Sequence, residues 1–315
     1  MLENKEFLKS AEICRKDFID LKSSIIELLE SNHNLILTGA PGTGKTYLAK
    51  EVAKEIMNIK DKEQIPFVQF HPSYDYTDFV EGLRPVSTEN NSSVTYFKRI
   101  DGHFKDLCKR AIGDPSRKFV FIIDEINRGD LNRIFGELFF LIEENYRTKI
   151  YNIVPEKVKI EHTVKTQYQN LITDNEDPFK EGFYIPDNIY IIGTMNDIDR
   201  SVESLDFAIR RRFAWKEIEY SDTAGAILSK TKNKDELILR LTSLNNTIKM
   251  ELGLSNDYQI GAAYLLQENY TNDDIDYEEL WDNRLEGLFK EYFRGDKDLN
   301  NKIDILKTSF LGLDY

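Results

Sequence analysis

Residues 39–46 read Gly-Ala-Pro-Gly-Thr-Gly-Lys-Thr, and glycines spaced in this way before a Lys-Thr pair are typical of a loop that binds phosphate groups. Glycines allow consecutive backbone N–H groups to point at phosphate oxygens, and the N-terminus of a following helix adds the positive end of its dipole. We expect Lys45 to contact the β- and γ-phosphates of a nucleoside triphosphate and the Thr46 hydroxyl to hold Mg²⁺. The alternative is a Gly-rich turn without a ligand, which would not require the complete pattern. The predicted phosphate-binding residues are Gly39, Ala40, Pro41, Gly42, Thr43, Gly44, Lys45 and Thr46.

Two carboxylates, Asp124 and Glu125, follow the apolar run at residues 119–123. Open α/β sheets bind their ligands at the carboxyl ends of the strands, so both side chains are expected beside the phosphates. Asp124 is expected to hold Mg²⁺ through water and also belongs to the predicted nucleotide-binding set, whereas Glu125 is the predicted general base that polarises the attacking water. Two solvated carboxylates at the end of a strand are the alternative.

A third polar segment, residues 193–201, reads GTMNDIDRS and follows another apolar run. In a parallel sheet its tip lies beside the γ-phosphate, where Asn196 could hydrogen-bond the attacking water or a phosphate oxygen. Asp199 is a further catalytic candidate at the same tip, or it pairs with Arg200 and holds the loop rigid. Alternatively, Asn196 and Asp199 only shape a turn.

Three consecutive arginines at residues 210–212 precede the last apolar run of this region. A basic triplet is commonly a solvated face or a nucleic-acid contact. At the edge of the domain, however, Arg211 and Arg212 could reach a nucleotide held by a neighbouring subunit and stabilise transition-state charge there. Arg128 and Asn127, directly after the carboxylate pair, are candidates for the same interface.

These residues require a parallel sheet to bring them together. Short apolar runs alternate with segments that have the residue spacing of helices. The apolar runs lie too far apart for hairpins, which indicates parallel strands covered by helices on both faces. A hairpin is expected between Pro85 and Arg99, around the polar turn TENNSS, and a helix is expected over residues 131–143. The predicted strands are Asn34–Thr38, Phe67–Phe70, Phe119–Ile123, Ile189–Gly193 and Phe213–Ile218.

The chain divides into three predicted parts. Residues 1–33 form an N-terminal helical segment, residues 34–220 form the α/β nucleotide-binding domain, and residues 221–315 form a smaller all-helical domain. Residues 146–187 combine a stretch rich in strand-forming residues with an acidic turn. They are expected to be an insertion into the α/β domain. The predicted fold class is therefore α/β, followed by a helical domain that covers the site.

Composition limits the class of protein. The 315 residues are 41% hydrophobic and 31% charged, as in a soluble globular protein, and no apolar stretch approaches the length of a membrane span. The net charge of −13 argues against wrapping DNA by the overall field of the chain. Cys14 and Cys108 give neither a disulfide framework nor metal-ligand spacing, so we expect a cytoplasmic protein. Because its apolar stretches are short, no membrane partner is expected.

Several strings together resemble the AAA+ superfamily and, more narrowly, its McrB family of GTPases. The Met-Asn-x-x-Asp-Arg-Ser string is more specific to this family than the phosphate loop. The five distinctive strings are Gln69-Phe-His-Pro-Ser-Tyr-Asp-Tyr-Thr-Asp-Phe-Val-Glu-Gly, Asp124-Glu-Ile-Asn-Arg-Gly, Gly193-Thr-Met-Asn-Asp-Ile-Asp-Arg-Ser, Leu205-Asp-Phe-Ala-Ile-Arg-Arg-Arg-Phe and Tyr258-Gln-Ile-Gly-Ala-Ala-Tyr.

The resemblance implies a hexameric ring that hydrolyses GTP between subunits and is activated by an McrC-like partner carrying the nuclease. Two other interpretations remain: an ATP-using AAA+ remodeller, and a nucleotide-gated scaffold that barely hydrolyses. The phosphate loop contacts only phosphates, so it does not distinguish GTP from ATP. The first strand is expected at Asn34, so a DNA-reading domain of the kind usual in this family would be a separate chain or lie outside this sequence. DNA is then expected to be contacted through the complex.

Overall fold

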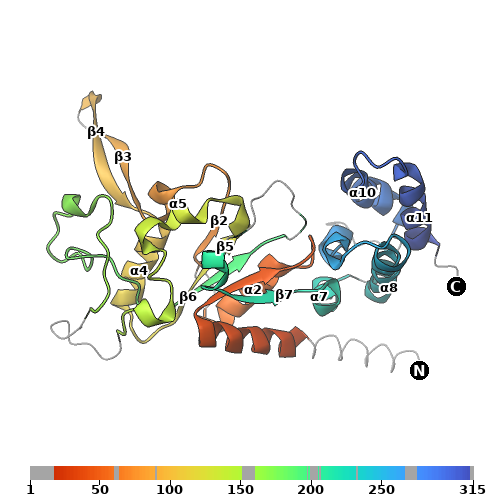
Figure 1. The fold of residues 1–315 in the computed structure, drawn as a ribbon, viewed down its shortest axis with the longest axis horizontal. Coiled ribbons are helices and arrows are strands. Elements are labelled where there is room, and N and C mark those ends of the chain that lie inside the picture. Colours follow the sequence, from red (N-terminus) through yellow and green to blue (C-terminus); the bar gives the residue numbers. More distant parts are fainter. Residues whose placement is uncertain are drawn as a thin grey trace.

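The computed structural model contains two hydrophobic cores. One is built from residues between Ile25 and Ile218, and the other from residues between Ala224 and Phe310. Figure 1 shows the corresponding α/β body and the group of helices at the C-terminal end of the chain. The structure describes residues 18–59, 64–88, 91–150, 160–196, 198, 205, 207–231, 233–266 and 275–312.

A five-stranded parallel sheet forms the centre of the first core, in the order β2-β5-β6-β1-β7. The described residues of β1, β5 and β6 are almost entirely buried, as expected for strands covered on both faces. The strands are β1 (Asn34–Thr38), β2 (Phe67–Gln69), β5 (Phe119–Asp124), β6 (Ile189–Thr194) and β7 (Ala214–Glu217). Each predicted strand is confirmed to within two residues, and so is the predicted fold class.

Helices connect these strands. A helix over residues 18–32 leads into β1, and α2 (Lys45–Ile56) follows it and packs on β5 and β6. The helix α4 (His103–Gly113) precedes β5, and the short α6 (Phe207–Arg210) precedes β7. Because β1, β5 and β6 run parallel, their carboxyl ends lie at one edge of the sheet.

The helix predicted over residues 131–143 is wrong beyond its first turns. The α-helix α5 covers only Leu131–Phe135, and a 3₁₀-helix, Gly136–Leu138, follows it. Gly136 has a φ of 51°, a conformation that ends a regular helix and that glycine adopts without the steric cost of a side chain. A β-carbon here would lie 3.1 Å from the ring of Tyr76, so tertiary packing also favours glycine at this position.

The predicted hairpin is confirmed and is longer than expected. Strands β3 (Glu81–Thr88) and β4 (Asn91–Asp101) pair antiparallel and project from the body in Figure 1. At the base of the hairpin, the fully buried Glu81 carboxylate accepts a hydrogen bond of 2.6 Å from Lys105 of α4. Arg99 adds ion pairs to Glu81 and Asp101. This charge network fixes the hairpin to α4.

The insertion at residues 146–187 contains no named strand in its described part. Its β-structure there consists of two isolated bridges, Thr148 to Pro186 and Val164 to Phe183. Residues 151–159 contain most of the stretch rich in strand-forming residues, and they lie outside the described residues. Two 3₁₀-helices, Glu144–Tyr146 and Gln169–Leu171, lie at its start and in its second half.

The second core is all-helical in its described residues. It packs Trp281, Phe289 and Phe310 at its centre. None of the described helices of the chain is long and apolar enough to cross a membrane. The elements are α7 (Tyr220–Ile227), α8 (Lys234–Asn246), the π-helix η6 (Thr247–Glu251), the 3₁₀-helices η7 (Asn256–Tyr258) and η8 (Ala262–Leu265), α9 (Tyr277–Leu280), the π-helix η9 (Trp281–Leu285), α10 (Glu286–Tyr292) and α11 (Leu299–Leu311).

Candidate nucleotide hydrolysis site

The Gly-rich loop connects β1 to the N-terminus of α2. Its glycines Gly39, Gly42 and Gly44 have φ angles of 131°, 76° and 83°, which side-chain-bearing residues rarely adopt. A β-carbon on Gly39 would also lie 2.4 Å from the Ile218 carbonyl oxygen. The pattern of glycines therefore reflects a backbone shape that other residues would strain.

Lys45 lies inside this loop and is 6% exposed. Its ammonium group donates hydrogen bonds of 2.8 Å to the Gly39 carbonyl and 2.7 Å to the Ala40 carbonyl. Backbone carbonyls thus help to balance the buried cation within the loop. A cation held among glycine N–H groups at a helix N-terminus is suited to bind an anion.

Asp124 accepts two hydroxyl hydrogen bonds at the end of β5. The Thr46 hydroxyl and the Thr194 hydroxyl each donate to the Oδ1 atom at 2.6 Å. A hydroxyl and a carboxylate side by side are oxygen ligands of the kind that Mg²⁺ binds in combination with phosphate and water. No group of three or more His, Cys, Asp or Glu suited to a metal occurs among the described residues.

Glu125 has a left-handed backbone conformation, with φ of 52° and ψ of 48°. Its Oε1 atom accepts a hydrogen bond of 2.6 Å from the Asn196 side-chain amide, and its Oε2 atom lies 3.4 Å from Arg128 Nε. Burial raises the pKa of Glu125 and neighbouring Asp124 adds to this effect, while Arg128 opposes it. A carboxylate with a raised pKa is better suited to accept a proton near neutral pH.

The structure therefore brings the P-loop residues, Asp124, Glu125, Arg128 and Asn196 together at one edge of the sheet. Thr194, which shares the Asp124 oxygen, was not among the predicted site residues. Its position two residues before Asn196, at the end of a buried strand, is the signal that could have identified it. Asp199 and Arg200 lie outside the described residues.

The arginine triplet separates into three environments. The Arg212 guanidinium lies 4.6 Å from the Phe139 ring centroid and is 9% exposed. Its Nε atom is 2.9 Å from Glu143 Oε1, an ion pair that lacks the geometry of a hydrogen bond. Arg210 stacks on the Trp215 ring at 4.9 Å. Arg211 is 68% exposed, with Glu143 at 3.6 Å, and is far more accessible to another molecule than Arg212.

The helical domain contacts the phosphate loop through its backbone, a feature not predicted from the sequence. The Gly261 N–H donates to the Pro41 carbonyl at 2.9 Å, and the Ala263 N–H donates to the Gly42 carbonyl at 3.1 Å. The approach is so close that a β-carbon on Gly261 would overlap Gly42. The string at residues 258–264 carries part of the family resemblance, but its residue types alone do not indicate that it meets the phosphate loop.

A cavity of about 690 Å³ lies between the two cores beside this contact. Arg128 and Asn196, which both contact Glu125, line it from the α/β domain, while Tyr258, Leu288 and Tyr292 line it from the helical domain.

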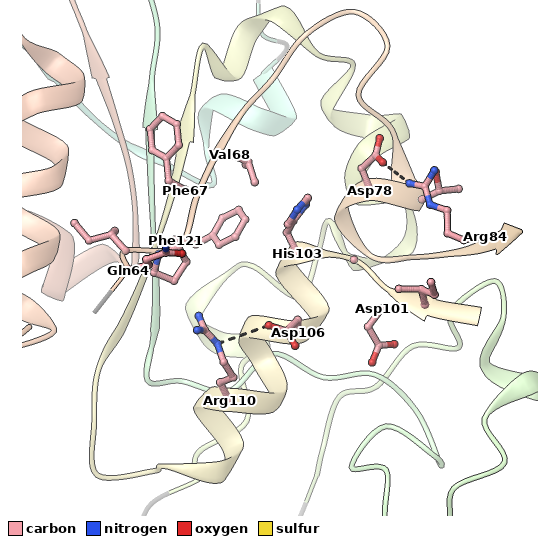
Figure 2. Close-up of a pocket in the computed structure, with 15 residues that line it drawn as sticks. Gln64, Phe67, Val68, Asp78, Arg84, Asp101, His103, Asp106, Arg110 and Phe121 are labelled. Atoms are coloured by element: carbon pink, nitrogen blue, oxygen red, sulfur yellow. Dashed lines mark hydrogen bonds and ion pairs between the residues drawn. The ribbon is translucent and has the colours of Figure 1, made fainter. Parts of the chain in front are cut away.

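A second cavity, of about 460 Å³, lies between the edge strand β2 and the N-terminal part of α4 (Figure 2). The ion pairs Arg84–Asp78 and Arg110–Asp106 line it. None of the predicted site residues lines it.

Comparison with known proteins agrees with this geometry. The family model of the AAA domain of the dynein-related subfamily matches residues 34–213, and the model of the McrB alpha-helical lid domain matches residues 236–303. The chain is 33% identical over 284 residues to the Type IV methyl-directed restriction enzyme EcoKMcrB subunit of Escherichia coli (strain K12). It is 26% identical over 302 residues to the Type II restriction enzyme BsuMI component YdiS of Bacillus subtilis (strain 168).

These matches cover most of this chain but not all of the relatives. They include 87% and 88% of this chain, and 56% and 82% of the Escherichia coli and Bacillus subtilis proteins, respectively. The solved structure of C. elegans PCH-2 aligns over 98% of this chain and 68% of the PCH-2 chain at 16% identity. Its TM-score of 0.30 is too low to support an inference about function. The two matching family models follow each other along the chain in the order of the two cores described above. The chain belongs to the McrB family of AAA+ proteins.

Proposed function

We propose that this chain is a GTP-hydrolysing motor that assembles into a ring, most simply a hexamer, and works with an McrC-like endonuclease subunit in DNA restriction or antiviral defence. The observation that carries the hydrolytic part is the contact of Asn196 with Glu125 beside Asp124 and the phosphate loop. The restriction context rests on the two relatives, which are named as parts of restriction enzymes. Contact with DNA is made through the assembled complex.

The proposed division of labour follows the two cores. Residues 34–220, with the insertion at 146–187, bind the nucleotide and carry the hydrolytic residues, and residues 221–315 form the lid. In the hydrolytic step, the loop N–H groups and Lys45 bind the phosphates. Thr46 and Asp124 would hold Mg²⁺, which would supply positive charge against the phosphates.

Within this arrangement, Glu125 accepts a proton from the attacking water. The Asn196 side-chain amide orients both the Glu125 carboxylate and this water. Asp199 is proposed as a further catalytic residue of the same segment. Arg211 and Arg212, together with Arg128, supply positive charge at the interface between subunits.

The test is turnover of GTP and ATP, each with Mg²⁺, by the parent chain and by Glu125→Gln. We expect GTP to be preferred and the variant to retain nucleotide binding while turnover falls by roughly 10²-fold or more. Faster turnover of ATP than of GTP would favour the ATP-using remodeller. Equal turnover by parent and variant, with and without the partner nuclease subunit, would favour the scaffold and refute a catalytic Glu125.

A further inference from the structure

Glu143 lies beside the last two arginines of the triplet. Its Oε1 atom is 2.9 Å from Arg212 Nε and 3.6 Å from Arg211 Nη2. The side chains of Leu141 and Ile142, which precede Glu143 in the chain, are fully buried, so the backbone that carries the carboxylate is well fixed. One carboxylate from a separate part of the fold therefore contacts both arginines.

Arg212 is held through its side chain and through its backbone. The guanidinium lies 4.6 Å from the Phe139 ring centroid, and its Nη1 atom donates a hydrogen bond of 2.8 Å to the Ala208 carbonyl. The Arg212 carbonyl accepts a hydrogen bond of 3.0 Å from the side-chain amide of Asn34, the first residue of β1. Asn34 in turn accepts a hydrogen bond of 2.6 Å from the buried guanidinium of Arg147. These contacts make Arg212 a fixed point of the turn.

Arg211 is held much less firmly. Its side chain is 68% exposed, and its distance of 3.6 Å from Glu143 is longer than that of a good hydrogen bond. Ion pairs between exposed side chains contribute little to stability, so Arg211 can leave Glu143 at low cost. A triphosphate carries several negative charges and attracts a guanidinium more strongly than one carboxylate does.

We propose that Glu143 is a positioning residue for the arginine turn. It holds Arg212 in place and keeps Arg211 beside the fixed point until the triphosphate bound by a neighbouring subunit takes Arg211 over. Glu143 acts through the arginines and does not touch the nucleotide. This inference rests on the proposed ring motor and names the side chain that places its arginines.

Glu143→Gln tests the role, because it removes the negative charge and keeps the shape of the side chain. A shift of about 1 Å in a catalytic group can cost roughly 10²-fold in rate, so turnover of GTP or ATP by the assembled full chain should fall by roughly tenfold to a hundredfold. The affinity of the variant for a fluorescent nucleotide should stay parental, because its own phosphate loop is intact.

Glu144→Gln is the matched control. Glu144 is the next carboxylate along the chain and is exposed, whereas the ion pairs of Arg211 and Arg212 described above go to Glu143. The control should keep parental turnover. Glu143→Asp retains the charge on a shorter side chain and should restore part of the turnover that Glu143→Gln loses.

Mixing of subunits separates positioning from a merely structural role. If Glu143 acts through the arginines, the defect of Glu143→Gln falls on the site of the neighbour. Glu143→Gln protein mixed with Glu125→Gln protein should then recover turnover, because some interfaces pair an intact Glu125 with a correctly placed arginine turn. Glu143→Gln protein mixed with Arg211→Ala/Arg212→Ala protein should recover none, because every interface lacks a correctly placed arginine turn.

Two more variants cover the case in which Glu143→Gln is poorly folded. Phe139→Leu removes the ring beneath Arg212 but leaves Glu143, and it should show a smaller loss of turnover with the same complementation by Glu125→Gln. Adding Glu143→Gln to the Arg211→Ala/Arg212→Ala variant should lower turnover no further, because no arginine is left to position. Thermal unfolding of each variant identifies any loss of fold.

The outcomes separate this inference from the proposed function. If the arginine variant complements Glu125→Gln but a folded Glu143→Gln protein does not, or if Glu143→Gln keeps parental turnover, the positioning role is wrong and the ring motor stands. If neither variant complements Glu125→Gln although subunits are shown to mix, the action of the arginines on a neighbouring subunit is overturned together with this inference.

Discussion

Gly261 offers a sharp test of whether the lid controls the phosphate loop. A β-carbon at this position would lie 1.9 Å from the Gly42 carbonyl carbon and 2.1 Å from the Thr43 nitrogen, both backbone atoms that cannot rotate away. In Gly261→Ala, the two backbones must therefore separate by about 1.1 Å to reach the shortest contact that real side chains make, 3.0 Å.

That separation removes both hydrogen bonds between the lid and the loop. The bonds from Gly261 to Pro41 and from Ala263 to Gly42, now 2.9 Å and 3.1 Å, would stretch to about 4 Å, beyond hydrogen-bond distance. At about 0.5–1.5 kcal/mol each, their loss costs about 1–3 kcal/mol. If nucleotide affinity depends on a docked lid, this cost corresponds to roughly 5- to 150-fold weaker binding.

The assay is a titration of fluorescent GTP and ATP analogues, with thermal unfolding measured in parallel. Gly287→Ala is the matched control, because Gly287 lies in α10 and a β-carbon added there would meet nothing within 4 Å. Alanine at this position is expected to be neutral or slightly stabilising. Parental affinity and unfolding temperature in Gly261→Ala would refute the coupling of lid and loop. Equal losses in both variants would point to a general effect on the lid.

Three further predictions concern the hydrolytic residues. Lys45→Ala should abolish nucleotide binding in a fluorescence titration while the monomer stays folded, and parental affinity would contradict the phosphate-binding role. Arg211→Ala/Arg212→Ala protein mixed with Glu125→Gln protein should recover turnover that neither has alone, whereas mixed rings without activity would count against a role in trans. Because burial raises the pKa of Glu125, its ionised form opposes folding at neutral pH. Glu125→Gln should therefore unfold at higher temperature at pH 7, an advantage that disappears below about pH 4 as both folded and unfolded parent become protonated; a constant difference across pH would disprove the shift.

The local sequence was sufficient to predict the site residues that lie at the ends of strands. The phosphate loop, the carboxylates Asp124 and Glu125, and Asn196 each follow a buried apolar run. Parallel strands place their carboxyl ends at one edge, so the expectation that these residues meet needed no knowledge of helix packing. The hairpin at residues 81–101 was predictable for a similar reason, because its two strands are joined by a short polar turn.

Other features depended on contacts that spacing along the chain does not encode. Gly136 looked compatible with a helix through residue 143, but it has a positive φ, and the Tyr76 ring lies where a β-carbon would crowd it. The three consecutive arginines were equivalent in the sequence, yet Arg212 is largely buried against Phe139 while Arg211 is 68% exposed, although both lie near Glu143.

The sequence by itself determined that a nucleotide site forms, because the loop, the carboxylates and the amide act through short-range backbone geometry and the order of parallel strands. Only the tertiary structure decided how that site is covered. Gly261 reaches Pro41 across 220 positions of the chain, and this contact exists because two separately formed cores pack against each other. Such packing depends on the complementary shapes of two folded surfaces, which residue types and periodicity do not specify.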